Sequence, residues 1–205
     1  MGDNPIFAKL FNKYNGKWRE ITPTLWLEIL EKQPQLIHYC LKYNVLTKFD
    51  GRDLRSIITS HPDIVKNKQF WRFMVEEGFL KFDSVDWVLL LENNPEYSYM
   101  CDKFNGWSTF TPTRWARLIS VKPQFASKID NNFPHIWGDF NGGNWAMILG
   151  DQPQFISKCD EYNGWEKLDQ NDWWAIYFSV TGKYKDQIEQ RANQYRAGRK
   201  MLQDL

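Results

Sequence analysis

The segment NWAMILGDQPQFISKCDEYNGW, residues 144–165, restates a pattern found thirty residues earlier in RWARLISVKPQFASKID, residues 114–130. In both segments a tryptophan stands eight positions before a proline, as Trp145 before Pro153 and Trp115 before Pro123. A period near thirty residues indicates an array of repeats, in which each repeat buries its apolar face only against its neighbours.

The same spacing recurs along most of the chain. An apolar residue stands eight positions before a proline in five places, and a sixth, Trp173, has Thr181 where the proline would be. These apolar residues, the origins of six repeats, lie 28, 33, 28, 30 and 28 residues apart and are Trp26, Leu54, Trp87, Trp115, Trp145 and Trp173. Nine of the eleven tryptophans stand at an origin or eight positions before one, which predicts that these rings form the core.

Each repeat predicts two short helices, about twelve in all, in antiparallel pairs. A residue able to cap a helix start stands four positions before every origin: Thr22, Asp50, Asp83, Thr111, Asn141 and Asp169. Prolines follow two of these caps, at a position where the missing N–H is tolerated. Asp53, Asp86 and Asp172 stand three positions after their caps and complete capping boxes.

The repeated proline ends the first helix of each pair and begins the second. The second helix ends near an Asn-Gly pair, where we expect the glycine to adopt the left-handed conformation. Such pairs stand at Asn15–Gly16, Asn105–Gly106 and Asn163–Gly164.

The pattern DW..LL...P.F...CD...GW, as in residues 86–95 and 144–165, resembles the tryptophan-rich helical repeats of proteins from gut bacteria and their phages. The resemblance covers roughly residues 14–182 and implies an interaction module without assigned chemistry. The second repeat departs from the pattern, with Leu46 and Leu54 in place of aromatic residues.

We therefore predict an all-α array of about six helix-turn-helix repeats, like an α-solenoid, over residues 1–182. Its repeats lie near residues 14–46, 47–79, 80–107, 108–137, 138–165 and 166–182. Residues 183–205 carry six basic and three acidic side chains and predict one basic C-terminal helix. We interpret this helix first as a cap on the array. The other interpretations are a seam for a partner helix and a contact to an acidic surface.

Composition excludes several classes of protein. The 205 residues carry a formal net charge of +1, which argues against a general polyanion binder. No apolar run is long enough to span a membrane, and the first residues lack a secretory signal. Three widely spaced cysteines suit a reducing compartment, and we expect a cytoplasmic protein.

No catalytic or metal-binding motif is present, so we predict a protein that is not an enzyme and needs no cofactor or metal. Cys40, Cys101 and Cys159 each stand six positions after a repeat proline and are interpreted as buried thiols. His61 stands directly before Pro62 and is interpreted as a variable junction residue. A site assembled in space from several repeats would leave no motif in the sequence.

The irregular segments supply the candidate partner-binding residues. The second repeat carries extra residues, KNKQFWRFMVEEGF, interpreted either as added core through Phe70, Trp71 and Met74 or as a protruding basic and aromatic ridge. We predict partner binding by Lys66, Lys68, Trp71, Arg72, Arg114, Arg117, Arg191, Arg196 and Arg199.

The expected function is recognition of another macromolecule on a surface made by several repeats, with a protein as the expected partner. A role as a phage-type inhibitor of a bacterial defence protein is compatible with the resemblance. The alternative is a nucleic-acid-binding repeat protein that stacks bases on exposed aromatic rings beside basic residues. The oligomeric state is left open.

Overall fold

The computed structural model describes residues 20–205, which form helices and turns without a strand. The contacts divide the chain into an N-terminal half that ends at Gly106 and a C-terminal half from Trp107 to Leu205. Each half holds three of the repeats and is described by itself. The predicted all-α helical-repeat array with a C-terminal cap is confirmed.

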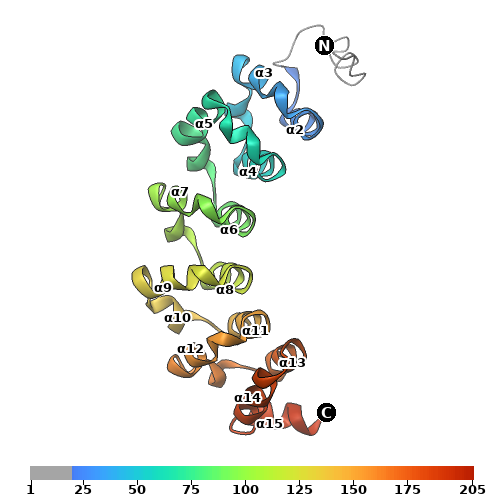
Figure 1. The fold of residues 1–205 in the computed structure, drawn as a ribbon, viewed down its shortest axis with the longest axis vertical. Coiled ribbons are helices and arrows are strands. Elements are labelled where there is room, and N and C mark those ends of the chain that lie inside the picture. Colours follow the sequence, from blue (N-terminus) through green and yellow to red (C-terminus); the bar gives the residue numbers. More distant parts are fainter. Residues whose placement is uncertain (1–19) are drawn as a thin grey trace. The chain divides into compact units, whose positions relative to one another are not determined.

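Every repeat begins with a first helix of ten residues (Figure 1). In the N-terminal half these are α2 (Pro23–Lys32), α4 (Gly51–Ser60) and α6 (Ser84–Asn93). In the C-terminal half they are α8 (Pro112–Val121), α11 (Gly142–Asp151) and α13 (Gln170–Ser179). Neighbouring first helices pack side by side within each half.

The second helices are shorter and start at the repeat proline with a 3-10 turn. These turns are η2 (Pro34–Leu36), η4 (Pro62–Lys66), η7 (Pro95–Tyr97), η9 (Pro123–Phe125) and η10 (Pro153–Phe155). The α-helices that follow are α3 (Ile37–Lys42), α5 (Lys68–Phe73), α7 (Ser98–Lys103), α9 (Ala126–Asn132) and α12 (Ile156–Glu161). The remaining elements before the C-terminal helices are η3 (Leu46–Lys48), η5 (Met74–Gly78), η6 (Phe79–Lys81), η8 (Gly106–Thr109), α10 (His135–Asp139) and η11 (Gly164–Lys167).

The helix starts follow the predicted capping rules. All six predicted cap side chains accept a hydrogen bond from an amide of the first turn, as Asp169 does from the Asp172 N–H at 2.8 Å. Reciprocal capping boxes form at Asp50, Asp83, Asn141 and Asp169. The one at Asn141 uses Asn144, which shows that an amide replaces the carboxylate at this position.

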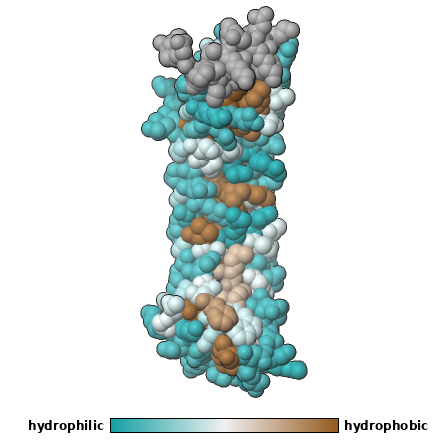
Figure 2. Space-filling view, turned by 90° about the vertical axis from the view of Figure 1, so that its right-hand side faces the viewer, coloured by the Kyte–Doolittle hydropathy of each residue, from teal (hydrophilic) through white to brown (hydrophobic). Residues whose placement is uncertain are grey.

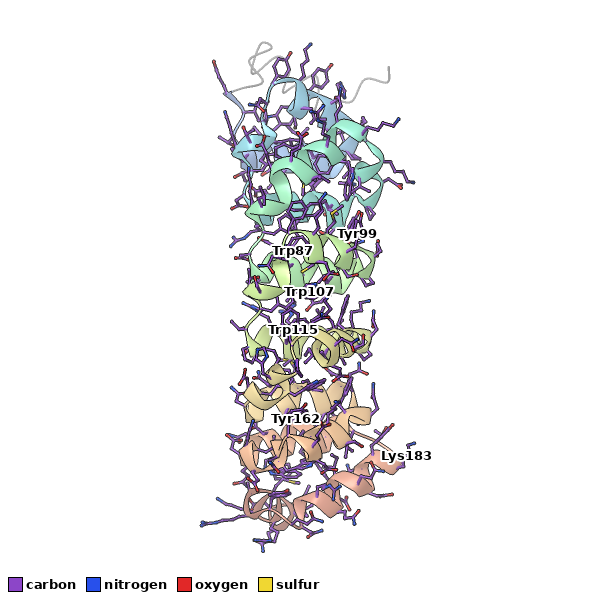
Figure 3. The ribbon with its side chains drawn as sticks, turned by 90° about the vertical axis from the view of Figure 1, so that its left-hand side faces the viewer. Trp87, Tyr99, Trp107, Trp115, Tyr162 and Lys183 are labelled. Atoms are coloured by element: carbon purple, nitrogen blue, oxygen red, sulfur yellow. The ribbon has the colours of Figure 1, made fainter. Side chains whose placement is uncertain are left out.

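Pairs of parallel rings join successive repeats. The indole of Trp165, at the end of the fifth repeat, stacks on that of Trp173 in the sixth, with centroids 5.2 Å apart and planes 15° apart. Trp107 stacks on Trp115 in the same way, at 5.1 Å and 10° (Figure 3). The origin tryptophans are at most 1% exposed, so the regular ring columns form the core, as predicted.

The left-handed residue at the end of the second helix is asparagine, so the prediction for glycine is wrong. Asn44, Asn105 and Asn163 have φ between 51° and 55°. The glycine that follows serves close packing, because a Cβ on Gly164 would lie 2.6 Å from the Cys159 Sγ and 2.7 Å from the Trp145 Nε1. Asn15–Gly16 lies outside the described residues.

The extra residues of the second repeat do not form one longer α-helix. After α5 the chain widens into the π-helical turn η5, which absorbs additional residues without ending the helix. Phe70 and Met74 are fully buried, which confirms the interpretation as added core for these two side chains.

The C-terminal segment forms two helices where the sequence predicted one, α14 (Lys183–Ala192) and α15 (Arg196–Gln203). The chain turns at residues 193–195, and Gly198 of α15 packs on the backbone of Ala192 so closely that a Cβ would lie 2.6 Å away. Both helices pack on α13, the last first helix, and therefore cap the array.

The first helical residue is proline in the first and fourth repeats (Pro23 and Pro112) and glycine in the second and fifth (Gly51 and Gly142), whereas the third and sixth differ, with Ser84 and Gln170. The packing around these glycines also recurs. The Lys81 Nζ donates to two carbonyl oxygens just before the cap of α4, and Lys167 does the same before the cap of α11. The second and fifth repeats thus share one arrangement of glycine and lysine at the helix start.

Candidate interaction surface

The first helices of the C-terminal half present a continuous set of outward positions. These positions lie two before, two after and six after each origin, and all of them are exposed. Since α8 packs on α11 and α11 on α13, the positions form three rows across the helices. The residues are Thr113, Arg117, Val121, Gly143, Met147, Asp151, Asn171, Ala175 and Ser179.

This surface combines exposed apolar side chains with polar residues, of which two, Arg117 and Asp151, are charged. Val121 is 50% exposed and Met147 38%, and Phe178 at the end of α13 is 67% exposed. The Phe178 ring stacks on the half-buried indole of Trp174 with centroids 5.2 Å apart. The nine outward residues, with Trp174 and Phe178, are the α8–α11–α13 face, and Figure 2 shows apolar patches on this side of the molecule.

The N-terminal half provides an internal comparison. On α2 and α4 the same outward positions carry charged side chains, namely Glu28, Lys32 and Arg52, whereas α6 carries the half-buried Val85 and Leu89 and the exposed Asn93. The helical-repeat fold therefore does not require an apolar outer side. Solvated protein surfaces rarely gather large exposed apolar side chains, whereas the centres of interfaces are poor in charge.

Two of the predicted partner-binding residues belong to this region. Arg117 is exposed and occupies the same row as Met147 and Ala175. Arg114 is half buried at the start of α8, where its backbone N–H donates to the Thr111 hydroxyl at 3.4 Å. The structure thus brings one predicted arginine next to an apolar surface that the sequence analysis did not select.

The predicted ridge of the second repeat is mostly engaged within the chain. Lys66 pairs with Asp63 at 2.5 Å, and Arg72 pairs with Glu76 at 2.7 Å. The half-buried Trp71 indole packs against the rings of Phe79 and Tyr97, with centroids 5.8 and 6.1 Å away. Lys68 is exposed. These contacts account for three of the four ridge residues without a partner.

The three predicted C-terminal arginines have different environments. Arg191 donates to the Asp160 carboxylate at 2.6 Å and ties α14 to α12. Arg199 donates to two backbone carbonyls, those of residues 193 and 194, and closes the turn between α14 and α15. Arg196 is exposed and lines a cleft of about 420 Å³ with Tyr195 and Lys200. Among these three arginines, Arg196 is the one without a hydrogen bond or ion pair to another part of residues 20–205.

The thiols occupy the core. Cys40, Cys101 and Cys159 are fully buried and form no disulfide, which confirms their interpretation, and burial raises the pKa of the Cys40 and Cys159 thiols. Nucleophilic cysteines need the opposite shift. Within residues 20–205 no group of three or more His, Cys, Asp or Glu side chains is placed to hold a metal ion.

No family model matches the chain, and no curated protein or solved structure resembles it closely enough to identify a relative. The resemblance to tryptophan-rich repeat proteins therefore stays a prediction. Over the described part of the chain, no helix has both the length and the apolar character to cross a membrane.

The sequence alone did not single out four residues of this face, because they lie outside the periodic columns. They are Val121, Met147, Trp174 and Phe178. The available signal was their placement six, two, one and five positions after an origin, where a repeat exposed to water carries polar residues. An apolar side chain there makes the helix apolar on its outer side as well as its core side.

Proposed function

We propose that the protein binds another protein through the α8–α11–α13 face. The observation that carries the proposal is the exposure of Val121, Met147 and Phe178 on a surface with only Arg117 and Asp151 as charged members. Burial of apolar side chains at the centre of an interface stabilises a complex, and polar residues at the rim set its register. The proposal contains no catalytic step and no cofactor.

A protein partner fits this surface better than a nucleic acid. Phosphate binding needs clustered cations, and base stacking needs exposed rings beside them. The tryptophans of the repeat columns are buried, and Arg117 is the only cation among the nine outward residues of the face. A partner protein with an apolar centre and polar groups opposite Arg117 and Asp151 complements this face.

The test is affinity capture from the source cell with the double variant Val121→Glu/Met147→Glu. The equivalent positions of α2 and α4 already carry Glu28 or other polar residues. The fold is therefore expected to tolerate a carboxylate at both sites. Charges buried at an interface centre weaken binding by about 2 kcal/mol, which is roughly thirty-fold in Kd.

The matched control is Asn93→Glu, because Asn93 occupies on α6 the position that Val121 occupies on α8. The proposal requires a protein that wild type and control retain at high salt and that the double variant loses. Equal retention by all three proteins, or recovery of nucleic acid alone with steep salt dependence, would refute it.

A further inference from the structure

Four outward residues of the α8–α11–α13 face form a compact quartet where α8 packs on α11. They are Arg117 and Val121 on α8 and Met147 and Asp151 on α11, and all four are exposed. Residues four apart on a helix lie about 6 Å apart along its axis, and packed helices lie about 8–10 Å apart. The quartet therefore occupies the corners of a parallelogram of roughly 6 by 9 Å.

Two hydrogen bonds between the repeats fix the register of the quartet. Near the helix starts, the Asn144 side-chain amide donates to the Thr113 hydroxyl at 3.3 Å. Just after the end of α11, the Gln152 side-chain amide donates to the Ser120 carbonyl at 2.6 Å. Residues at the same position after the two origins are therefore held roughly level with each other.

The quartet has its apolar side chains on one diagonal and its charges on the other. Val121 is 50% exposed and Met147 38%. Arg117 and Asp151 carry opposite charges, so the quartet has no net charge. A surface without net charge does not repel its own copy, whereas like charges opposed at an interface weaken it.

This arrangement matches a copy of itself. In a two-fold symmetric dimer, when one residue contacts another across the interface, the reciprocal contact also forms. A two-fold axis that runs in the plane of the face along the apolar diagonal brings Val121 and Met147 each onto its own copy. The same axis brings Arg117 of each chain to Asp151 of the other, so the ion pair forms twice.

The equivalent quartet of the N-terminal half lacks this match. Its members are Glu28 and Lys32 on α2 and Ser56 and Ser60 on α4. The same axis would place Lys32 on Lys32 of the copy, which opposes like charges. The match therefore comes from the side chains of α8 and α11 and not from the repeat fold.

We propose that the α8–α11–α13 face binds a second copy of this chain, with the two-fold axis along the diagonal from Val121 to Met147. The inference rests on the proposed function, because it names the partner of the same face. The Arg117 guanidinium has five N–H donors, so it binds the Asp151 carboxylate of the second copy in addition to contacts within its own chain.

The size of the face sets the expected strength of the dimer. Three helices of ten residues give a face of about 15 by 25 Å. Interfaces of this size are at the small end for specific complexes. We therefore expect a reversible dimer with a Kd in the micromolar range.

Sedimentation equilibrium of the full-length protein measures the association. The average mass is expected to rise with concentration from the 24.5 kDa of one chain toward twice that value. Val121→Glu/Met147→Glu is expected to stay monomeric, because it places like charges on the axis. A wild-type protein that is still monomeric at about 1 mM, far above the expected Kd, or a double variant that dimerises like wild type would overturn the inference.

Exchange of the two charges tests the two-fold arrangement itself. Arg117→Asp places acids at both charged corners and Asp151→Arg places bases at both, so each variant alone opposes like charges and its Kd is expected to rise at least tenfold. An equimolar mixture of the two variants restores both ion pairs and is expected to dimerise like wild type. A mixture that associates no more than either variant alone contradicts the arrangement.

Val121→Cys tests the axis even if a charge variant fails to fold. The new thiol meets its own copy, so mild oxidation is expected to join two chains by a disulfide. Asn93→Cys is the matched control, because Asn93 has the equivalent position on α6, and it is expected to stay unlinked. The native cysteines are buried and do not compete. Equal cross-linking of the two variants, or none in either, would count against the axis.

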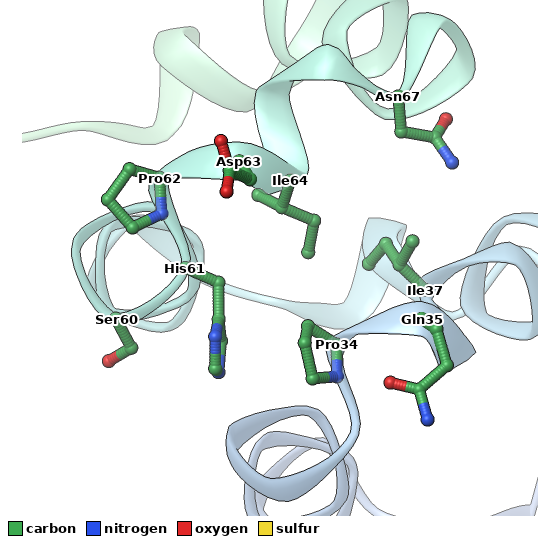
Figure 4. Close-up of a pocket in the computed structure, with 9 residues that line it drawn as sticks. All are labelled: Pro34, Gln35, Ile37, Ser60, His61, Pro62, Asp63, Ile64 and Asn67. Carbon is green, nitrogen blue, oxygen red and sulfur yellow. The ribbon is translucent and has the colours of Figure 1, made fainter.

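A cavity in the N-terminal half supplies a reference surface for these measurements. It has a volume of about 440 Å³ and lies between the proline turns of the first two repeats, with Gln35 in its lining (Figure 4). Gln35→Glu is expected to leave the dimer Kd within twofold, because Gln35 is far in the sequence from α8 and α11 and belongs to the other half. A tenfold rise in Kd would contradict the assignment to α8 and α11.

Affinity capture separates this inference from the proposed function. A wild type that stays monomeric, while the double variant still loses a captured protein of different sequence, overturns only the second copy as the partner. Equal retention of every captured protein by wild type and double variant overturns the proposed function, and the dimer through this face with it.

Discussion

Gly164 offers a sharp test of the repeat core, because a single methyl group there has no space. A Cβ would lie 2.6 Å from the Cys159 Sγ and 2.7 Å from the Trp145 Nε1, whereas ordinary contacts begin near 3.4 Å. Both neighbours are fully buried, so one must move by most of an ångström. Such overpacking costs about 1–3 kcal/mol.

The restriction of the unfolded chain by alanine opposes the cost of overpacking, but it is smaller. Alanine restricts the unfolded chain more than glycine does and stabilises by about 0.4–1 kcal/mol where the native backbone accepts it. The φ of Gly164 is not positive, so alanine can adopt the same backbone conformation. We therefore expect Gly164→Ala to lower the free energy of unfolding by about 1–2 kcal/mol. The first repeat carries a buried Val45 at this position, so the backbone there accepts a Cβ.

Urea unfolding followed by tryptophan fluorescence and circular dichroism measures the change, and hydrogen exchange of α11 and α12 amides localises it. Gly138→Ala is the matched control in the same half, because its Cβ would meet nothing closer than 4.0 Å. That substitution lies within α10 and is expected to stabilise by about 0.5–1 kcal/mol. If Gly164→Ala proves as stable as wild type, the tight contact between glycine, thiol and indole is wrong.

Two further predictions concern buried polar groups. Burial raises the pKa of Asp86 more than its hydrogen bond with Arg55 lowers it, so its protonated form favours the folded state and stability falls as pH rises above the usual Asp value. Asp86→Asn is expected to show a shallower decline in the free energy of unfolding between pH 4 and 6, and an unchanged slope would contradict the assignment. Asp160→Ala removes the acceptor of the buried Trp165 indole N–H, at 2.7 Å, and is expected to cost about 1–3 kcal/mol, whereas Arg191→Ala breaks only a partly exposed ion pair and costs under about 1 kcal/mol in the same urea titration. Equal costs for these two variants would show that the indole bond contributes nothing.

Local rules predicted the helix starts and the core. The caps at Asp50 and Asp169 depend on residues three positions apart, and the stacked rings depend on a spacing of eight, so both are readable from sequence. The features that differed from the predictions depend on contacts between separate elements. The C-terminal segment forms two helices in which Gly198 packs on Ala192 across the turn, and sequence alone does not place those two residues together.

The candidate surfaces were less predictable for a related reason. Basic residues such as Arg191 and Arg72 looked free in the sequence, but a folded chain places carboxylates beside them. The apolar Met147 lies outside the periodic columns, and its exposure depends on which sides of α11 the neighbouring helices cover.

The glycines at the starts of α4 and α11 restrict how such a protein can grow or be redesigned. A Cβ on either glycine would collide with the carbonyl of the lysine that clamps the preceding loop, at 2.5 Å for Gly51 and 2.3 Å for Gly142. Hairpins are therefore not interchangeable modules. An engineer who wishes to lengthen the array should keep each of these glycines together with the lysine of the following repeat, since a larger residue at the helix start leaves no room for that lysine.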